Sequence, residues 1–195
     1  MKTTSGTFWA VLGLTMFAAT PAFAHLDPLE HGSFAAGFSH PLFGLDHILA
    51  MVGVGLWASL LGGRAIWAVP SAFVATMVAG FALSMTTIGL PFVEPVIAAS
   101  VVALGLLALV ALQAPTAIAA LMVAAFALFH GYAHGSELGA AGTLPFMAGF
   151  ALATAALHAA GVFAGLVAGR FTGSMAARIA GGFVALGGLW IAVGN

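Results

Sequence analysis

The sequence predicts an all-α membrane protein, a single-domain bundle of six transmembrane helices that follows a cleaved signal peptide. Of its 195 residues, 63% are hydrophobic and 5% are charged, whereas a soluble domain carries about 25% charged residues. A chain with so few charges cannot cover its whole surface with well-solvated groups. Its apolar runs also approach the roughly 20 residues that a helix needs to cross the hydrocarbon core of a bilayer. Both observations indicate a polytopic membrane protein.

The absence of cysteine limits the chemistry of any bound group. None of the 195 residues is a cysteine, which excludes disulfides, thiolate metal sites and covalent haem attachment. A metal would therefore be held by imidazole, carboxylate, thioether or backbone oxygen. The net charge of −1 gives no indication of nucleic-acid binding, and no nucleic-acid partner is expected.

Residues 1–24 are expected to be a secretory signal peptide. Lys2 begins a short positive region, an apolar core follows over residues 7–19, and small residues stand at Ala22 and Ala24. The core is short for a membrane span, which favours cleavage between Ala24 and His25 over an uncleaved anchor. The mature chain, residues 25–195, would then be a bacterial inner-membrane protein with an exported N-terminus.

Six apolar runs in the mature chain are the expected spans. Short breaks rich in glycine and proline separate them, as at Gly62-Gly63-Arg64 and Gln113-Ala114-Pro115. Loops this short are expected to make consecutive helices antiparallel neighbours. The expected spans cover residues 40–62, 66–89, 92–112, 115–138, 143–169 and 175–194.

The arginines give the orientation independently of the signal peptide. With the mature N-terminus outside, Arg64, Arg170 and Arg178 all fall in or beside loops on the cytoplasmic side, and Glu94 falls on the other side. This distribution is the one that the positive-inside rule expects. Both mature termini are therefore predicted to lie in the periplasm.

The stretch FHGYAHGSE, residues 129–137, carries the denser of two polar motifs inside the spans. His130, His134 and Glu137 follow one another at intervals of four and three residues, so a helix places them on one face. A histidine pair at this spacing can offer two imidazoles to one divalent metal. Gly131 and Gly135 leave bare backbone beside these ligands, where a helix or an ion could approach.

The stretch HPLFGLDHILAM, residues 40–51, carries the second polar motif. His40 and His47 are seven residues apart and would share a helix face, with Pro41 in the first helical turn. Asp46 could supply an oxygen ligand, or it could accept a hydrogen bond that fixes a histidine tautomer. The spacing does not choose between these two roles.

The expected topology brings the two motifs to the same side of the membrane. Span one begins outside and span four ends outside, so both motifs lie near the periplasmic surface. His158 falls near the middle of span five and would form a further polar station in the membrane. His25 and His31 precede the first span; they could help to capture a metal, although a polar exported segment is equally ordinary.

Ionisable side chains inside a bilayer cost roughly 2.5–3.5 kcal/mol each on insertion scales. A single intramembrane histidine is often hydrogen-bonded across helices without any further role. Purely structural contacts would more naturally use serine, threonine or asparagine. The combination of five histidines and two carboxylates in these spans therefore predicts an ion-binding site.

The two motifs together resemble those of the HupE/UreJ family of nickel and cobalt permeases. The resemblance extends to the signal peptide, the six-span layout and the length of the chain. The residues that carry it are His40-Pro41-Leu42-x-Gly44-x-Asp46-His47-x-x-Ala50-Met51 and His130-Gly131-x-Ala133-His134-Gly135-x-Glu137.

The resemblance implies uptake of Ni²⁺ or Co²⁺ across the inner membrane, for hydrogenase, urease or cobalamin assembly. It places the metal-binding role on the six motif residues, while the role of His158 depends on its expected depth alone. Imidazole and carboxylate also suit Zn²⁺. No nucleotide-binding loop is present, so no ATPase function is expected of this chain, and a homo-oligomer stays open. The motif residues are His40, Asp46, His47, His130, His134 and Glu137.

Two other functions are compatible with the same residues. An intramembrane zinc hydrolase could hold the metal with three histidines and an aspartate, and Glu137 could act as its general base. A membrane metal sensor or delivery protein would bind the ion without moving it. We expect a transporter rather than an enzyme, because no residue stands out as binding an organic substrate.

Overall fold

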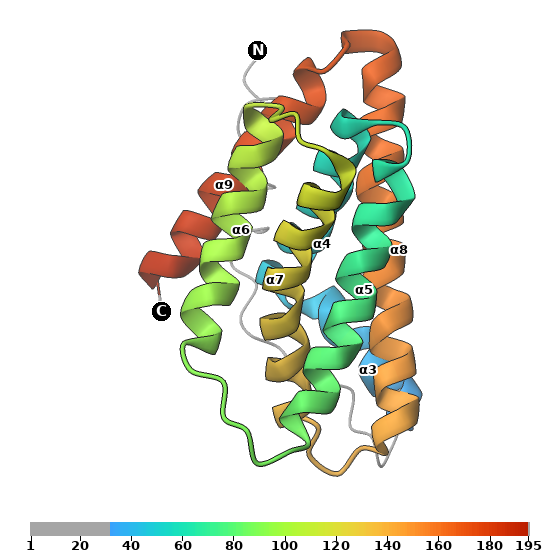
Figure 1. Cartoon of the computed structure of the whole chain (residues 1–195), viewed down its shortest axis with the longest axis vertical. Helices are drawn as coiled ribbons and strands as arrows, with labels where there is room; N and C mark the ends of the chain where they lie inside the picture. Colours follow the sequence, from blue (N-terminus) through green and yellow to red (C-terminus); the bar gives the residue numbers. More distant parts are fainter. Residues whose placement is uncertain (1–31, 195) are drawn as a thin grey trace, which may run out of the picture.

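The computed structural model describes residues 32–194, and this part of the chain is entirely helical (Figure 1). The expected signal peptide at 1–24, together with His25 and His31, lies outside the described residues. The helices are α3 (Ser33–Phe43), α4 (Leu45–Leu61), α5 (Ala65–Ser84), α6 (Val93–Leu109), α7 (Thr116–Ser136), α8 (Thr143–Thr172) and α9 (Met175–Gly194).

Four of these helices, α5, α7, α8 and α9, are long and apolar enough to cross a membrane by themselves. The pair α3 and α4 passes the same test as one broken span, bent by 79°, and α6 is a shorter apolar helix of 17 residues. The described chain is thus a multi-pass membrane protein, and a full count of six spans stays a prediction.

The first expected span is not the straight helix over residues 40–62 that the sequence predicted. The helix begins earlier, at Ser33, and breaks after Phe43. Pro41 lies near the C-terminal end of α3 instead of in a first turn. Pro41 cannot donate a backbone hydrogen bond within the helix, and α3 ends two residues later, at Phe43. Gly44 then adopts an extended conformation, with φ −85° and ψ 115°, and α4 starts in a new direction.

Helix packing does not follow the order of the chain. The most extensive contacts join α5 with α7, α6 with α9, α4 with α8 and α3 with α8. The expectation that all consecutive helices are close neighbours was therefore wrong for two pairs, α5 with α6 and α7 with α8. Helices pack together instead where small residues let their backbones approach closely. At Gly131, an added Cβ would collide with the carbonyl oxygen of Met77, so only glycine lets α7 lie this close to α5.

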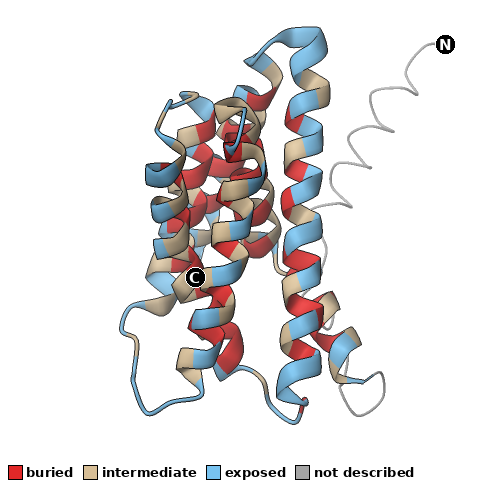
Figure 2. Ribbon diagram, turned by 45° about the vertical axis from the view of Figure 1, so that its right-hand side comes forward, coloured by how far each residue is buried: buried red, intermediate tan, exposed pale blue. Residues whose placement is uncertain are grey.

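The outer surface of the bundle is apolar, as a lipid-facing surface requires. Buried residues lie on the helix faces that turn toward one another, and exposed residues lie outside (Figure 2). Trp67, Phe163 and Val193 are 63%, 69% and 86% exposed. A soluble monomer rarely leaves so many large apolar groups in water, so these side chains are suited to contact lipid.

The bundle has two chemically different ends. At one end, Arg178 Nε donates a hydrogen bond to the Leu109 carbonyl, and Trp57 Nε1 donates one to the Leu112 carbonyl. These bonds join the C-terminal ends of α4 and α6 to the start of α9. The polar motifs lie at the opposite end, where α4 begins and α7 finishes.

Candidate metal site

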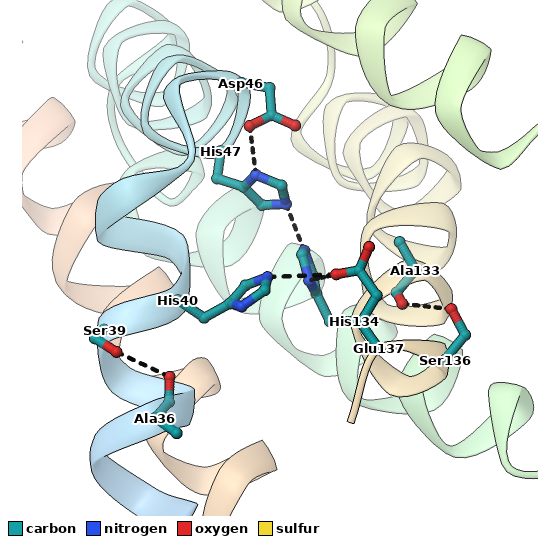
Figure 3. A network of polar contacts seen from close by, with 9 residues as sticks. All are labelled: Ala36, Ser39, His40, Asp46, His47, Ala133, His134, Ser136 and Glu137. Atoms are coloured by element: carbon teal, nitrogen blue, oxygen red, sulfur yellow. Dashed lines mark hydrogen bonds and ion pairs between the residues drawn. The ribbon is translucent and has the colours of Figure 1, made fainter. Parts of the chain in front are cut away.

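The two polar motifs meet where α4 begins and α7 ends, as the sequence predicted. Figure 3 shows side chains from both motifs facing one another. His40 comes from the last turn of α3, and Asp46 and His47 come from the first turn of α4. His134 lies in the last turn of α7, and Glu137 follows directly after it. The break at Gly44 turns the two halves of the first motif toward α7. His40 and His47 thus reach one site from two helices, and not from one helix face.

Gly44 leaves room for the side chains that follow this break. A Cβ at position 44 would lie 2.7 Å from His47 Nδ1 and 2.9 Å from Asp46 Oδ1. These two atoms are themselves 2.6 Å apart and form a hydrogen bond. Glycine therefore leaves the space in which the carboxylate of Asp46 and the ring of His47 come together.

An inner group consists of His47, His130 and His134. Each offers one ring nitrogen, and these atoms lie within 4.8 Å of one another. His130 and His134 are 0% and 1% exposed, and His47 is 7% exposed. His47 Nδ1 donates to Asp46 Oδ1, so its Nε2 carries the lone pair and faces His134 Nε2. Of the two roles that the sequence left open for Asp46, the structure shows the hydrogen bond that orients a histidine.

An outer group consists of His40, His134 and Glu137, again with potential ligand atoms within 4.8 Å of one another. Glu137 Oε2 lies 3.6 Å from His40 Nε2 and 3.5 Å from His134 Nδ1. The Glu137 side chain is 50% exposed, whereas the His40 side chain is 8% exposed. His134 belongs to both groups and presents a different ring nitrogen to each.

A cavity of about 180 Å³ opens between these side chains. Its wall includes Asp46, Glu137 and Glu94 at the start of α6. Asp46 and Glu94 also line an adjacent cavity of about 410 Å³ between α6 and α9. Three carboxylates around one opening create a negative potential that favours cations. The sequence analysis used Glu94 only for orientation and did not indicate it as a site residue, because it stands far along the chain from both motifs.

A second residue that the sequence patterns did not indicate is Ser100 on α6. Its side chain is completely buried, and its Oγ lies 3.0 Å from His130 Nε2. Nothing in the spacing of the chain identifies this contact. A serine in an apolar span is ordinary, and only the packing of α6 against α7 brings it to the histidine.

Aromatic rings enclose the buried histidines. The Phe150 ring centroid lies 4.3 Å from that of His134 and 6.1 Å from that of His40. Phe73 lies on the inner side, with its centroid 5.6 Å from His130 and 5.0 Å from His158. These rings limit the access of water to the inner group. A low local dielectric strengthens the interaction of any cation with its ligands.

His158 lies apart from both histidine groups, and its ring packs against that of Phe73. Its side chain is 1% exposed, and neither ring nitrogen has a hydrogen-bond partner among residues 32–194. It borders an apolar cavity of about 590 Å³ between α5 and α8. The structure thus places His158 apart from the motif residues, with Phe73 in contact with both His130 and His158.

The donor set of the site is imidazole nitrogen and carboxylate oxygen. These ligands suit Ni²⁺, Co²⁺ and Zn²⁺, whereas Mg²⁺ and Ca²⁺ prefer sites made of oxygen alone. Buried imidazoles also bind a divalent cation without adding negative charge to the membrane interior. The site can therefore hold a transition metal, and its two overlapping groups can hold the metal in two neighbouring positions.

The helical bundle and its buried histidine cluster define a multi-pass membrane protein with a candidate transition-metal site. The family model described as HupE / UreJ protein matches residues 12–191. The chain is also 48% identical over 178 residues to Protein HupE of Rhizobium leguminosarum bv. viciae, covering 90% of this chain and 93% of that protein. The chain belongs to the HupE/UreJ family, a family of nickel and cobalt transporters. No solved structure matches it.

Proposed function

We propose that this protein is a permease of the bacterial inner membrane that takes up divalent nickel, cobalt or both from the periplasm. The observation that carries the proposal is the convergence of four histidines and two carboxylates from α3, α4 and α7 at one end of a bundle with few other charges. Membership of the HupE/UreJ family supports transport over catalysis. The metal would serve hydrogenase, urease or cobalamin assembly, as the family resemblance implies.

The proposed orientation places the site on the periplasmic side. Six spans, counting α3 with α4 as one and including α6, would put both mature termini outside. The arginine-bearing loops would then lie in the cytoplasm, in agreement with the positive-inside rule. The cavity bordered by Asp46, Glu94 and Glu137 would open to the periplasm and attract cations there.

In the proposed mechanism, His134 lets the cation change ligands without becoming uncoordinated. The cation first binds in the outer group, beside His134 Nδ1 and the half-exposed Glu137. It then exchanges these ligands for His47 and His130, beside His134 Nε2. Stepwise exchange avoids the large free-energy cost of an unpaired charge in a low-dielectric interior.

The next proposed step carries the cation past Phe73 toward His158. Phe73 contacts both His130 and His158, so its ring must move before the cation can pass between them. His158 offers two unpartnered ring nitrogens at this depth within the described part of the chain. It is the residue on which we expect the cation to rest before it leaves on the cytoplasmic side.

The decisive experiment is uptake of radioactive Ni²⁺ and Co²⁺ into proteoliposomes that contain the purified protein. The wild type is compared with His47→Ala, His134→Ala and His158→Ala. Gln113→Ala is the control, because Gln113 is a polar side chain at the opposite end of the bundle, where it hydrogen-bonds the Leu60 carbonyl. We expect uptake by the wild type and the control, and strongly reduced uptake by the three histidine variants.

Metal binding measured on the same proteins separates the steps. His47→Ala and His134→Ala should weaken binding, whereas His158→Ala should bind the metal and fail to pass it on. Binding by the wild type without any uptake would contradict the permease and would favour a sensor, a delivery protein or a zinc hydrolase. The ratio of nickel to cobalt uptake would establish the selectivity.

A further inference from the structure

Ser100 makes two contacts through a single hydroxyl group. Its Oγ lies 2.7 Å from the carbonyl oxygen of Ile97 and 3.0 Å from Nε2 of His130. Both Ser100 and His130 are 0% exposed, so water does not compete for these bonds. The carbonyl oxygen can only accept, which means that the serine must donate its hydrogen to Ile97.

The direction of the Ser100–Ile97 hydrogen bond determines which nitrogen of the His130 ring carries the hydrogen. A hydroxyl carries one hydrogen, so after donating to Ile97 the Ser100 oxygen can only accept. His130 must then donate its Nε2–H to Ser100. In a neutral imidazole the other nitrogen carries the lone pair, which here is Nδ1. In residues 32–194, His130 Nδ1 is buried and has no hydrogen-bond partner.

We propose that Ser100 is a positioning residue that holds His130 in the Nε2–H tautomer and keeps its Nδ1 lone pair available for the transported cation. The inference rests on the proposed function, since it assigns how one ligand of that site is prepared. Ser100 itself does not touch the metal. It acts through the histidine, in the way that hydrogen-bond partners behind metal ligands commonly fix ring orientation and tautomer.

His47 and His130 are held in opposite tautomers. Asp46 accepts from Nδ1 of His47 and leaves Nε2 for the cation. Ser100 accepts from Nε2 of His130 and leaves Nδ1. In this proposal the two ligands bind the cation through different ring nitrogens. The partner that fixes the tautomer is the adjacent residue for His47 and a residue of another helix for His130. A neutral hydroxyl suits His130, because its position is fully buried and a second carboxylate there would cost more free energy to desolvate.

The direct test is the tautomer of His130 in the full-length, metal-free protein in lipid nanodiscs. Nitrogen-15 NMR distinguishes a protonated from an unprotonated ring nitrogen, and His130→Gln identifies the signals that belong to His130. We expect Nε2 to carry the hydrogen and Nδ1 to be unprotonated. A His130 ring protonated at Nδ1 in the wild type would overturn the proposal without any Ser100 variant.

Substitution tests the consequence for binding. Ser100→Ala should lower the affinity for Ni²⁺ by about 10- to 100-fold, the usual effect of removing such a partner. The matched control is Ser59→Ala, since Ser59 makes the same bond to the carbonyl three residues earlier, 2.6 Å to Leu56, at the other end of α4. Ser59→Ala should leave the affinity unchanged.

The outcomes distinguish this proposal from the proposed function. If Ser100→Ala binds Ni²⁺ as tightly as the wild type while His47→Ala and His134→Ala do not, the role of Ser100 is refuted and the metal site stands. If none of these variants alters Ni²⁺ binding, the metal site itself is wrong. If Ser59→Ala weakens binding as much as Ser100→Ala, loss of the helix bond explains the effect, and the tautomer role is refuted.

Discussion

At the scale of single residues, His134 connects the two halves of the site. Its ring centroid lies 4.4 Å from that of His47 and 4.5 Å from that of His40. One nitrogen faces the buried inner group and the other faces the half-exposed Glu137. A single imidazole thus belongs to two potential metal positions, which is the simplest arrangement for passing a cation from one to the other.

Asp46→Asn should lower the affinity for Ni²⁺ by about 10- to 100-fold, because the amide is a weaker acceptor for the Nδ1–H of His47 than the carboxylate. The substitution keeps the shape of the side chain, so the thermal unfolding temperature should change little. Isothermal titration of the purified protein with Ni²⁺ measures the affinity. An unchanged affinity would indicate that Asp46 only stabilises the first turn of α4 through the helix dipole.

Glu137→Gln should raise the KM for Ni²⁺ uptake several-fold and change the maximal rate much less. The side chain is 50% exposed and belongs to the outer group, so its charge acts on capture of the cation from solution. Initial rates of uptake into proteoliposomes over a range of Ni²⁺ concentrations give both constants. A lowered maximal rate with an unchanged KM would instead place Glu137 in a later step.

At the scale of helices, close backbone contacts decide which elements pack together. The contact of α5 with α7 places Phe73 against the His130 ring, and it requires glycine at position 131. Glycine at position 44 acts differently, since a Cβ there would lie against the side chains of the Asp46–His47 pair. Both glycines shape the site without contacting a metal.

Gly131→Ala should destabilise the protein by about 1–3 kcal/mol, because a methyl group inserted into a tight contact forces the helices apart. The matched control is Gly169→Ala in α8, where an added Cβ meets nothing within 4 Å. Since alanine is the better helix former, the control should be neutral or stabilised by up to about 1 kcal/mol. Thermal unfolding in detergent compares the two, and equal stability would contradict the packing argument.

At the scale of the whole molecule, opposite charges gather at opposite ends of the bundle. Arg64 precedes α5, and Arg178 lies near the start of α9, where it bonds to the end of α6. Asp46, Glu94 and Glu137 border the cavity at the other end. This asymmetry supports the proposed orientation in the membrane, in which the candidate metal site lies on the side that lacks arginine.

Cysteine labelling should establish that orientation, because the natural chain contains no cysteine. Thr87→Cys lies between α5 and α6, and Ser174→Cys lies between α8 and α9. A membrane-impermeant thiol reagent added to spheroplasts should label position 87 and should not label position 174 until the membrane is opened. The reverse pattern would place the metal site in the cytoplasm and would contradict uptake from the periplasm.

Much of the candidate site could be predicted from the sequence because its residues stand in an apolar background. His130 and His134 are one helical turn apart, so their common face follows from helix geometry alone. The meeting of the two motifs at one end follows from the alternating direction of consecutive spans. Composition and the length of the apolar runs were likewise sufficient to predict a helical membrane protein.

Only the tertiary structure decided how the first motif bends and which side chains meet. Pro41 was compatible with a helix start, but in the structure it lies near the end of α3, which packs against α8. Ser100 and Phe73 contact the histidines from other helices, and Glu94 borders the same cavity from α6. Spacing along the chain predicts which residues share a helix face, because a shared face depends on local helix geometry alone. Contacts between helices depend on how whole surfaces fit together, and no single segment of sequence contains that information.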